Sequence, residues 1–157
     1  MTPPICFLEG TQITTPSGTS AVELLSIGDD VLLPNGNIYK VKFLGKQSFD
    51  LAQSPEAHPV TFDPGSLGVN MPNSPLHVSR AHLVWNGSAL TSAFEHINGT
   101  TIKPMDNPPS IINYYHVELE EYSIVIANGA WCESYSGGLR DEFHYTTKIN
   151  GENLALA

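Results

Sequence analysis

The chain has 157 residues, 41% of them hydrophobic, and a formal net charge of -9. This length and apolar content fit one globular domain with a core and exclude wholesale disorder. The acidic balance argues against nucleic acid or an anionic membrane surface as partners, because the sequence has no basic stripe to neutralise phosphates. No apolar run is long enough to span a bilayer, and the N-terminal segment MTPPIC lacks a signal-peptide pattern. The sequence leaves the cellular compartment unknown.

Glycines and prolines, 13 and 12 in number, separate short apolar runs throughout the chain. This pattern is typical of many short strands joined by turns, so it predicts an all-β fold. Pro34–Asn37 predicts a hairpin turn, and Asn128–Gly129 predicts a second turn. The predicted strands are Ile13–Thr15, Val31–Leu33, Ile38–Leu44, Val60–Phe62, Leu76–Trp85, Thr100–Lys103, Ile111–Leu119, Tyr122–Ala127 and Ala130–Tyr135.

Two segments predict helical structure. One helical turn is expected within Ala21–Ile27, and Ala89–His96 is the best helix candidate. After Gly138 the apolar pattern thins, and one further strand is expected at Phe143–Thr147. The predicted organisation is a flank at residues 1–5, one domain at 6–136 and a tail at 137–157.

Cys6 is the residue whose position suggests chemistry most directly. Its thiol could attack the carbonyl of Ile5, just upstream, and convert the Ile5–Cys6 peptide bond into a thioester. A thiolate is a strong nucleophile, but the tetrahedral oxyanion needs fixed donors and the departing amine needs a proton. A histidine is the natural proton donor, since its ordinary pKa is about 6.5.

The segment LHVSRAH offers a candidate pair, Ser79 and His82. Residues three apart lie on opposite faces of a regular strand, so the pair can act together only if the strand breaks at Arg80–Ala81. In the functional interpretation, Ser79 orients the scissile amide and His82 protonates its nitrogen. The alternative is a serine at a strand end beside a partly buried histidine.

Four segments, in this order, resemble the Hint (Hedgehog/intein) family: CFLEGTQI, VELLSIGDDVLLPNG, LHVSRAHLV and HVELEEYSIVIANGAWCES. The resemblance runs from Cys6 to about Ser136 and is closest to the bacterial intein-like domains that lack a full splicing apparatus. It implies an all-β, flattened horseshoe of many short strands with pseudo-twofold symmetry.

The resemblance also implies roles for single residues. It assigns the nucleophile to Cys6, and it assigns activation of the scissile amide to Ser79 and His82. His116 lies near a position where inteins place an aspartate that assists the cysteine, so His116 is either a base or a core histidine. Tyr122 occupies a position where related bacterial domains often carry histidine, which makes it a candidate for a second step.

The chain departs from splicing inteins at its C-terminal motif. Those inteins end in His-Asn, and the equivalent stretch Gly129–Ser134 has no such pair. Full splicing is therefore not expected. Because the ends of a Hint domain meet at the active site, the resemblance also implies that Cys132 lies near Cys6 and can form a blocking disulfide with it. The alternative is that Cys132 is a buried apolar filler.

The six histidines form no zinc-binding motif, and the two cysteines are not a CxxC pair, so neither a metal site nor a cofactor is expected. The expected partners are the chain's own upstream segment in cis and water or an external nucleophile.

Three functions remain open. The first is autoprocessing by an N-to-S acyl shift at Ile5–Cys6, leading to cleavage or acyl transfer without splicing. The second is a degenerate, catalytically silent Hint domain that serves as a structural or interaction module. The third is an unrelated secreted β-domain that binds carbohydrate or a partner.

Overall fold

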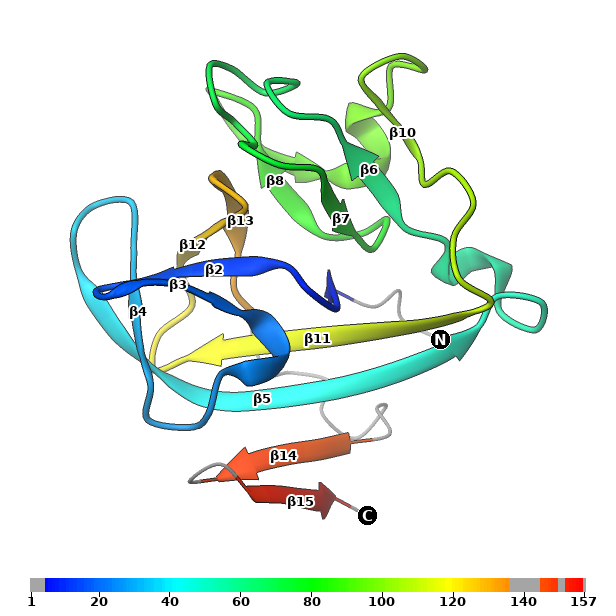
Figure 1. The fold of residues 1–157 in the computed structure, drawn as a ribbon. Helices are drawn as coiled ribbons and strands as arrows, with labels where there is room; N and C mark the ends of the chain where they lie inside the picture. The colour runs from blue at the N-terminus through cyan, green and yellow to red at the C-terminus, as the bar shows by residue number, and fades with distance from the viewer. Residues whose placement is uncertain (1–4, 136–144, 150–151, 157) are drawn as a thin grey trace.

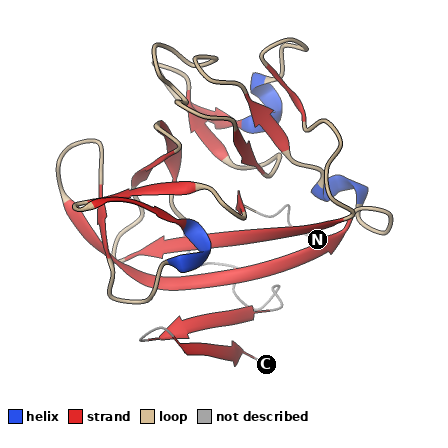
Figure 2. Ribbon diagram, in the orientation of Figure 1, coloured by secondary structure: helices blue, strands red, loops and turns tan. Residues whose placement is uncertain are grey.

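The computed structural model describes residues 5–135, 145–149 and 152–156, and this part of the chain is built from strands and short turns (Figures 1 and 2). Its helical segments are single 3-10 turns, so the predicted all-β class is confirmed. These turns are η1 (Val22–Leu24), η2 (Pro55–Ala57) and η3 (Ala93–His96).

The strands form a seven-stranded sheet, a six-stranded sheet and a two-stranded C-terminal hairpin. In spatial order, the first sheet contains β10 (Ile102–Pro104), β6 (Val60–Phe62), β7 (Leu76–Val78), β1 (Phe7–Leu8), β11 (Ile111–Leu119), β5 (Ile38–Asp50) and β4 (Asp30–Leu32). The second contains β3 (Gly18–Ala21), β2 (Gln12–Thr15), β12 (Ile124–Ala127), β13 (Ala130–Glu133), β8 (Leu83–Trp85) and β9 (Leu90–Ser92). The hairpin consists of β14 (Tyr145–Ile149) and β15 (Glu152–Leu156).

The longest pairing joins β5 to β11, two long antiparallel strands that lie side by side (Figure 1). Every residue of β11 from Tyr114 to Leu119 is buried, and β1 pairs with its other edge at Tyr114 and Tyr115. A strand that is buried on both faces usually has a mostly apolar sequence, so a histidine within it is unusual. His116 is that residue.

Two turns close hairpins as the sequence predicts. Gly36 has a φ of 88° in the turn between β4 and β5, a conformation that glycine adopts without strain. Asn128 and Gly129, with φ angles of 47° and 81°, join β12 to β13. A Cβ atom at Gly129 would lie 2.7 Å from the side-chain nitrogen of Asn73, so this position also has no room for a side chain.

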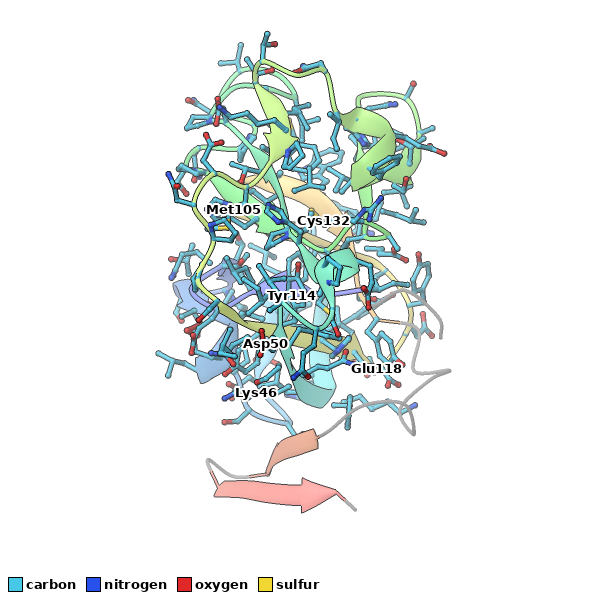
Figure 3. The ribbon with its side chains drawn as sticks, turned by 90° about the vertical axis from the view of Figure 1, so that its right-hand side faces the viewer. Lys46, Asp50, Met105, Tyr114, Glu118 and Cys132 are labelled. Atoms are coloured by element: carbon cyan, nitrogen blue, oxygen red, sulfur yellow. The ribbon has the colours of Figure 1, made fainter. Side chains whose placement is uncertain are left out.

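Within the described part of the chain, the buried hydrophobic side chains form two clusters. The larger one spans both sheets and includes Phe7, Phe62 and Cys132. The smaller one contains Cys6 together with Phe49, Ala57, Ile112 and Tyr114. Figure 3 marks Tyr114 of the smaller cluster and Cys132 of the larger one. Burial of this apolar surface supplies the main driving force for folding.

Some predicted boundaries are wrong. The helix candidate Ala89–His96 is instead strand β9 followed by the single 3-10 turn η3. Its apolar residues have helical spacing, but the segment is short and pairing of β9 with β8 takes precedence. The predicted strand at Phe143–Thr147 overlaps β14, but residues 143 and 144 lie outside the described residues, as do 1–4 and 136.

Candidate functional site

The register of the first sheet brings Cys6 beside two other predicted site residues. Phe7 pairs with Val78 of β7 on one side and with Tyr115 of β11 on the other, both antiparallel. In an antiparallel ladder, the residue before Phe7 faces the residue after each partner. Cys6 therefore lies between Ser79 and His116.

Ser79 holds the backbone of Cys6 in two ways. The Cys6 amide N–H donates to Ser79 Oγ at 2.9 Å, and the Ser79 amide N–H donates to the Cys6 carbonyl at 3.1 Å. The first contact involves the nitrogen of the Ile5–Cys6 bond itself. The predicted role of Ser79, orienting that amide, is compatible with this geometry.

The predicted strand Leu76–Trp85 is broken where the chemistry requires it. The His82 amide N–H donates to the Ser79 carbonyl at 3.1 Å and closes a turn between β7 and β8. The turn brings His82 back to the same site, where its Nδ1 lies 3.0 Å from the carbonyl oxygen of Cys6. The ring also packs against Phe7, with 4.4 Å between centroids.

His116 contacts both the nucleophile and the bond that it would attack. Its Nε2 lies 3.3 Å from Cys6 Sγ, and its Nδ1 lies 2.9 Å from the carbonyl oxygen of Ile5. One neutral tautomer satisfies both contacts, with Nδ1–H donating to the oxygen and Nε2 accepting from the thiol. The imidazole can thus accept the thiol proton and bind the developing oxyanion.

Burial dominates the electrostatics of these groups. It raises the pKa of the Cys6 thiol well above its ordinary value, although the hydrogen bond with Ser79 acts in the opposite direction. It lowers the pKa of His116 to about 3, against a hydrogen bond to Ile5 that favours the charged form. The resting pair is therefore a neutral thiol and a neutral imidazole, and ionisation has to occur within the pair.

Sequence reasoning missed Glu133, whose side chain is only 5% exposed. Its main-chain carbonyl accepts from His82 Nε2 at 2.9 Å, and its Oε2 accepts the Leu83 amide N–H at 2.8 Å. Its Oε1 accepts the Tyr122 hydroxyl at 2.6 Å. A carboxylate at the end of the otherwise apolar strand β13 (Ala130–Glu133) is the sequence signal that could have drawn attention to it.

Tyr122 is connected to this site through Glu133. The Tyr122 hydroxyl donates its hydrogen bond to the Glu133 carboxylate, and the main-chain carbonyl of Glu133 in turn contacts His82.

Cys132 and Cys6 are both free thiols, and they belong to different hydrophobic clusters. Cys132 packs in the larger cluster, and the two cysteines are not joined by a disulfide in this structure.

The Asn128–Gly129 bond is held in its turn. Asn128 Oδ1 accepts the Gln12 amide N–H at 2.8 Å, and its Nδ2 donates to the Pro75 carbonyl at 2.9 Å. With both ends of the side chain fixed, the amide serves to connect β12 with β2. The turn interpretation of this pair agrees with the structure.

Within the described part of the chain, no three His, Cys, Asp or Glu side chains gather closely enough to hold a metal ion. No helix among the described residues has the length and apolar character that crossing a membrane requires.

Comparisons with known proteins agree on the fold. The family model described as "Hint domain" matches residues 5–138. The bacterial intein-like domain from Clostridium thermocellum matches with a TM-score of 0.59 and 13% identity, covering 83% of this chain and 99% of its own. The MchDnaB-1 intein matches with a TM-score of 0.59, 10% identity and coverages of 82% and 99%. A substituted variant of the gp41-1 intein matches with a TM-score of 0.56, 14% identity and coverages of 81% and 97%. No curated protein gives a significant match.

Proposed function

Because this chain belongs to the Hint domain family, we propose that it is an autoprocessing domain acting on its own Ile5–Cys6 bond. The reaction is an N-to-S acyl shift, followed by cleavage or acyl transfer of the upstream segment and without splicing. The observation that carries the proposal is the position of His116, whose two ring nitrogens contact the Cys6 sulfur and the Ile5 carbonyl oxygen.

In the first step His116 acts as base and as oxyanion donor. Its Nε2 takes the thiol proton while Cys6 Sγ attacks the carbonyl carbon of Ile5. The ring becomes an imidazolium at the moment when the oxygen gains charge, and its Nδ1–H becomes a stronger donor to that oxygen. This arrangement overcomes the raised pKa of the thiol, because the proton moves only as the new bond forms.

In the collapse of the tetrahedral intermediate, His82 delivers a proton to the nitrogen of Cys6 and the carbon–nitrogen bond breaks. The product is a thioester between Ile5 and Cys6 Sγ, with the amine of Cys6 released. Ser79 Oγ, which lies 2.9 Å from that nitrogen, keeps the amide oriented during the step. His82 Nδ1 is now 3.0 Å from the adjacent carbonyl oxygen, so proton delivery requires a small shift of the ring or of the amine.

Resolution of the thioester requires a second nucleophile, either water or an external thiol or amine. It attacks the Ile5 carbonyl carbon, takes the upstream acyl group and leaves Cys6 as a thiol. The absence of a His-Asn pair in Gly129–Ser134 supports an end product without a ligated downstream segment.

A silent Hint domain is the second candidate, and the burial of the site favours it. Cys6 and His116 are fully buried and His82 is 2% exposed, so a resolving nucleophile must reach an enclosed carbonyl. Ile5 is itself partly exposed, which leaves the acyl side of the bond nearer to solvent.

A reporter protein fused upstream of Ile5 separates the two candidates. Incubation with a small thiol should release the reporter from the parent fusion, and the Cys6→Ala fusion should stay intact under the same conditions. If the parent and Cys6→Ala fusions are equally stable in the presence of thiol, the domain is catalytically silent.

A further inference from the structure

His82 faces two oxygen atoms that can only accept hydrogen bonds. Its Nδ1 lies 3.0 Å from the Cys6 carbonyl oxygen and its Nε2 lies 2.9 Å from the Glu133 carbonyl oxygen. A neutral imidazole carries one N–H and can donate to one of them, whereas an imidazolium donates to both. The geometry of the site thus suits the charged, acidic form of His82.

The Glu133 carboxylate is fixed next to this ring. Its two oxygens accept the Leu83 amide N–H and the Tyr122 hydroxyl at 2.8 and 2.6 Å. Leu83 directly follows His82 in the chain, so the carboxylate is tied to the segment that carries the imidazole. The negative charge favours the protonated ring, while burial, the larger effect, lowers the pKa of His82.

The other groups around His82 do not supply this charge. From the N-terminal segment it meets the Cys6 carbonyl and the Phe7 ring, and the neutral His116 of β11 is close enough to interact with it electrostatically. On the packed η3 turn, Glu95 is exposed, and His96 Nδ1 contacts the Ser92 carbonyl at 2.9 Å. The guanidinium of Arg80, on the turn itself, stacks on the Phe94 ring at 4.6 Å.

We infer that Glu133 is a positioning residue for the acyl shift: it keeps the proton on His82 that the departing amine of Cys6 receives. Tyr122 and the Leu83 amide hold the carboxylate in place for this task. The inference rests on the proposed function for its catalytic consequence, but the link between Glu133 and His82 is measurable by itself.

Glu133→Gln removes the charge and keeps an oxygen to accept the Leu83 amide. NMR titration of His82 in the full chain, with Cys6→Ala present to prevent reaction, should show a pKa lower by about one unit in Glu133→Gln. Glu118→Gln, which alters another buried carboxylate bonded to Lys42, should leave His82 unchanged. An identical His82 titration in Glu133→Gln and its parent would overturn the inference.

Tyr122→Phe is the second variant, because its half-exposed side chain can lose a hydroxyl without disturbing the fold. It removes one of the two hydrogen bonds that hold the Glu133 carboxylate beside His82, so His82 should titrate at a lower pH than in the parent. An unchanged or upward-shifted His82 titration would contradict the inference even if Glu133→Gln fails to fold.

The catalytic consequence is tested in the reporter fusion. Thiol-dependent release should be roughly tenfold slower in Glu133→Gln at neutral pH, with the deficit shrinking as the pH is lowered. Equal rates in Glu133→Gln and the parent would overturn the positioning role. If the parent releases nothing while Glu133→Gln still shifts His82, the proposed function fails and the coupling between the two residues stands.

Discussion

His116 Nε2 lies 3.3 Å from the sulfur of Cys6, although 110 residues separate the two in the chain. The contact arises because β1 is inserted between β7 and β11, in a register that aligns Cys6 with the middle of β11. The same imidazole contacts the Ile5 carbonyl oxygen, so one side chain touches both the attacking sulfur and the carbonyl that it would attack.

Asparagine at position 116 separates the two roles of the imidazole. His116→Asn keeps an N–H donor for the Ile5 oxygen but has no base for the thiol. We expect reporter release to slow by roughly 100-fold at neutral pH, the usual range for loss of a general base. We also expect the rate of the variant to rise steeply with pH, because the buried thiol must then ionise without help.

The control for this experiment is the pH profile of the parent fusion, which should rise much less over the same alkaline range. His116→Asp, which restores a base but no donor to the Ile5 oxygen, should recover part of the rate. A parent and a His116→Asn variant with the same rate and the same pH dependence would show that His116 is a core histidine.

The folded-state pKa of His116 also predicts how stability changes with pH. Because burial lowers that pKa to about 3 from an ordinary value of 6.5, the unfolded chain binds more protons between these values. The stabilisation is present in full above about pH 6.5 and is lost as the pH falls, by up to about 1.4 kcal/mol per pH unit.

Urea denaturation of the parent and of His116→Asn at a series of pH values measures this effect. The free energy of unfolding should fall more steeply with acid in the parent, since the two proteins share every titratable group except His116. Parallel curves for the two proteins would contradict the lowered pKa.

Ser79 is expected to act through its hydroxyl. Ser79→Ala leaves the buried Cys6 amide N–H without its acceptor, which should cost about 1–3 kcal/mol of stability and slow reporter release roughly tenfold. Ser79→Thr keeps the hydroxyl and should remain within a few-fold of the parent. If Ser79→Ala and Ser79→Thr release the reporter equally fast, the serine only fills space.

Both thiols should resist alkylation in the folded chain. Cys6 and Cys132 are completely buried, and burial raises the pKa of each, so little reactive thiolate is exposed. Iodoacetamide followed by peptide mass spectrometry should label neither residue in buffer and both in denaturant. Rapid native labelling of Cys6 alone would show that the site opens to solvent.

Much of the candidate site could be predicted from the sequence because it depends on short segments whose turns can be inferred from neighbouring residues. The spacing of Ser79 and His82 conflicts with a regular strand, so cooperation between them required the turn that the structure contains. The turn at Asn128–Gly129 follows in the same way from residues that tolerate positive φ. The resemblance to Hint domains supplied the order of the segments and the position of Cys6.

The rest depends on pairings between distant strands. Glu133 acquires its position because β13 pairs with β8, which places its carboxylate beside the Leu83 amide. No pattern within the segment AWCES indicates that neighbour. The helix expected at Ala89–His96 is wrong for the same kind of reason, since β9 is held in strand form by β8.

The central claim is that a thioester forms between Ile5 and Cys6, and trapping with hydroxylamine tests it most directly. The upstream reporter should be released from the parent fusion with a hydroxamate on Ile5, identified by intact mass, and Cys6→Ala should yield none. Release with a hydroxamate at another residue, or an intact parent fusion after prolonged treatment, would contradict the account.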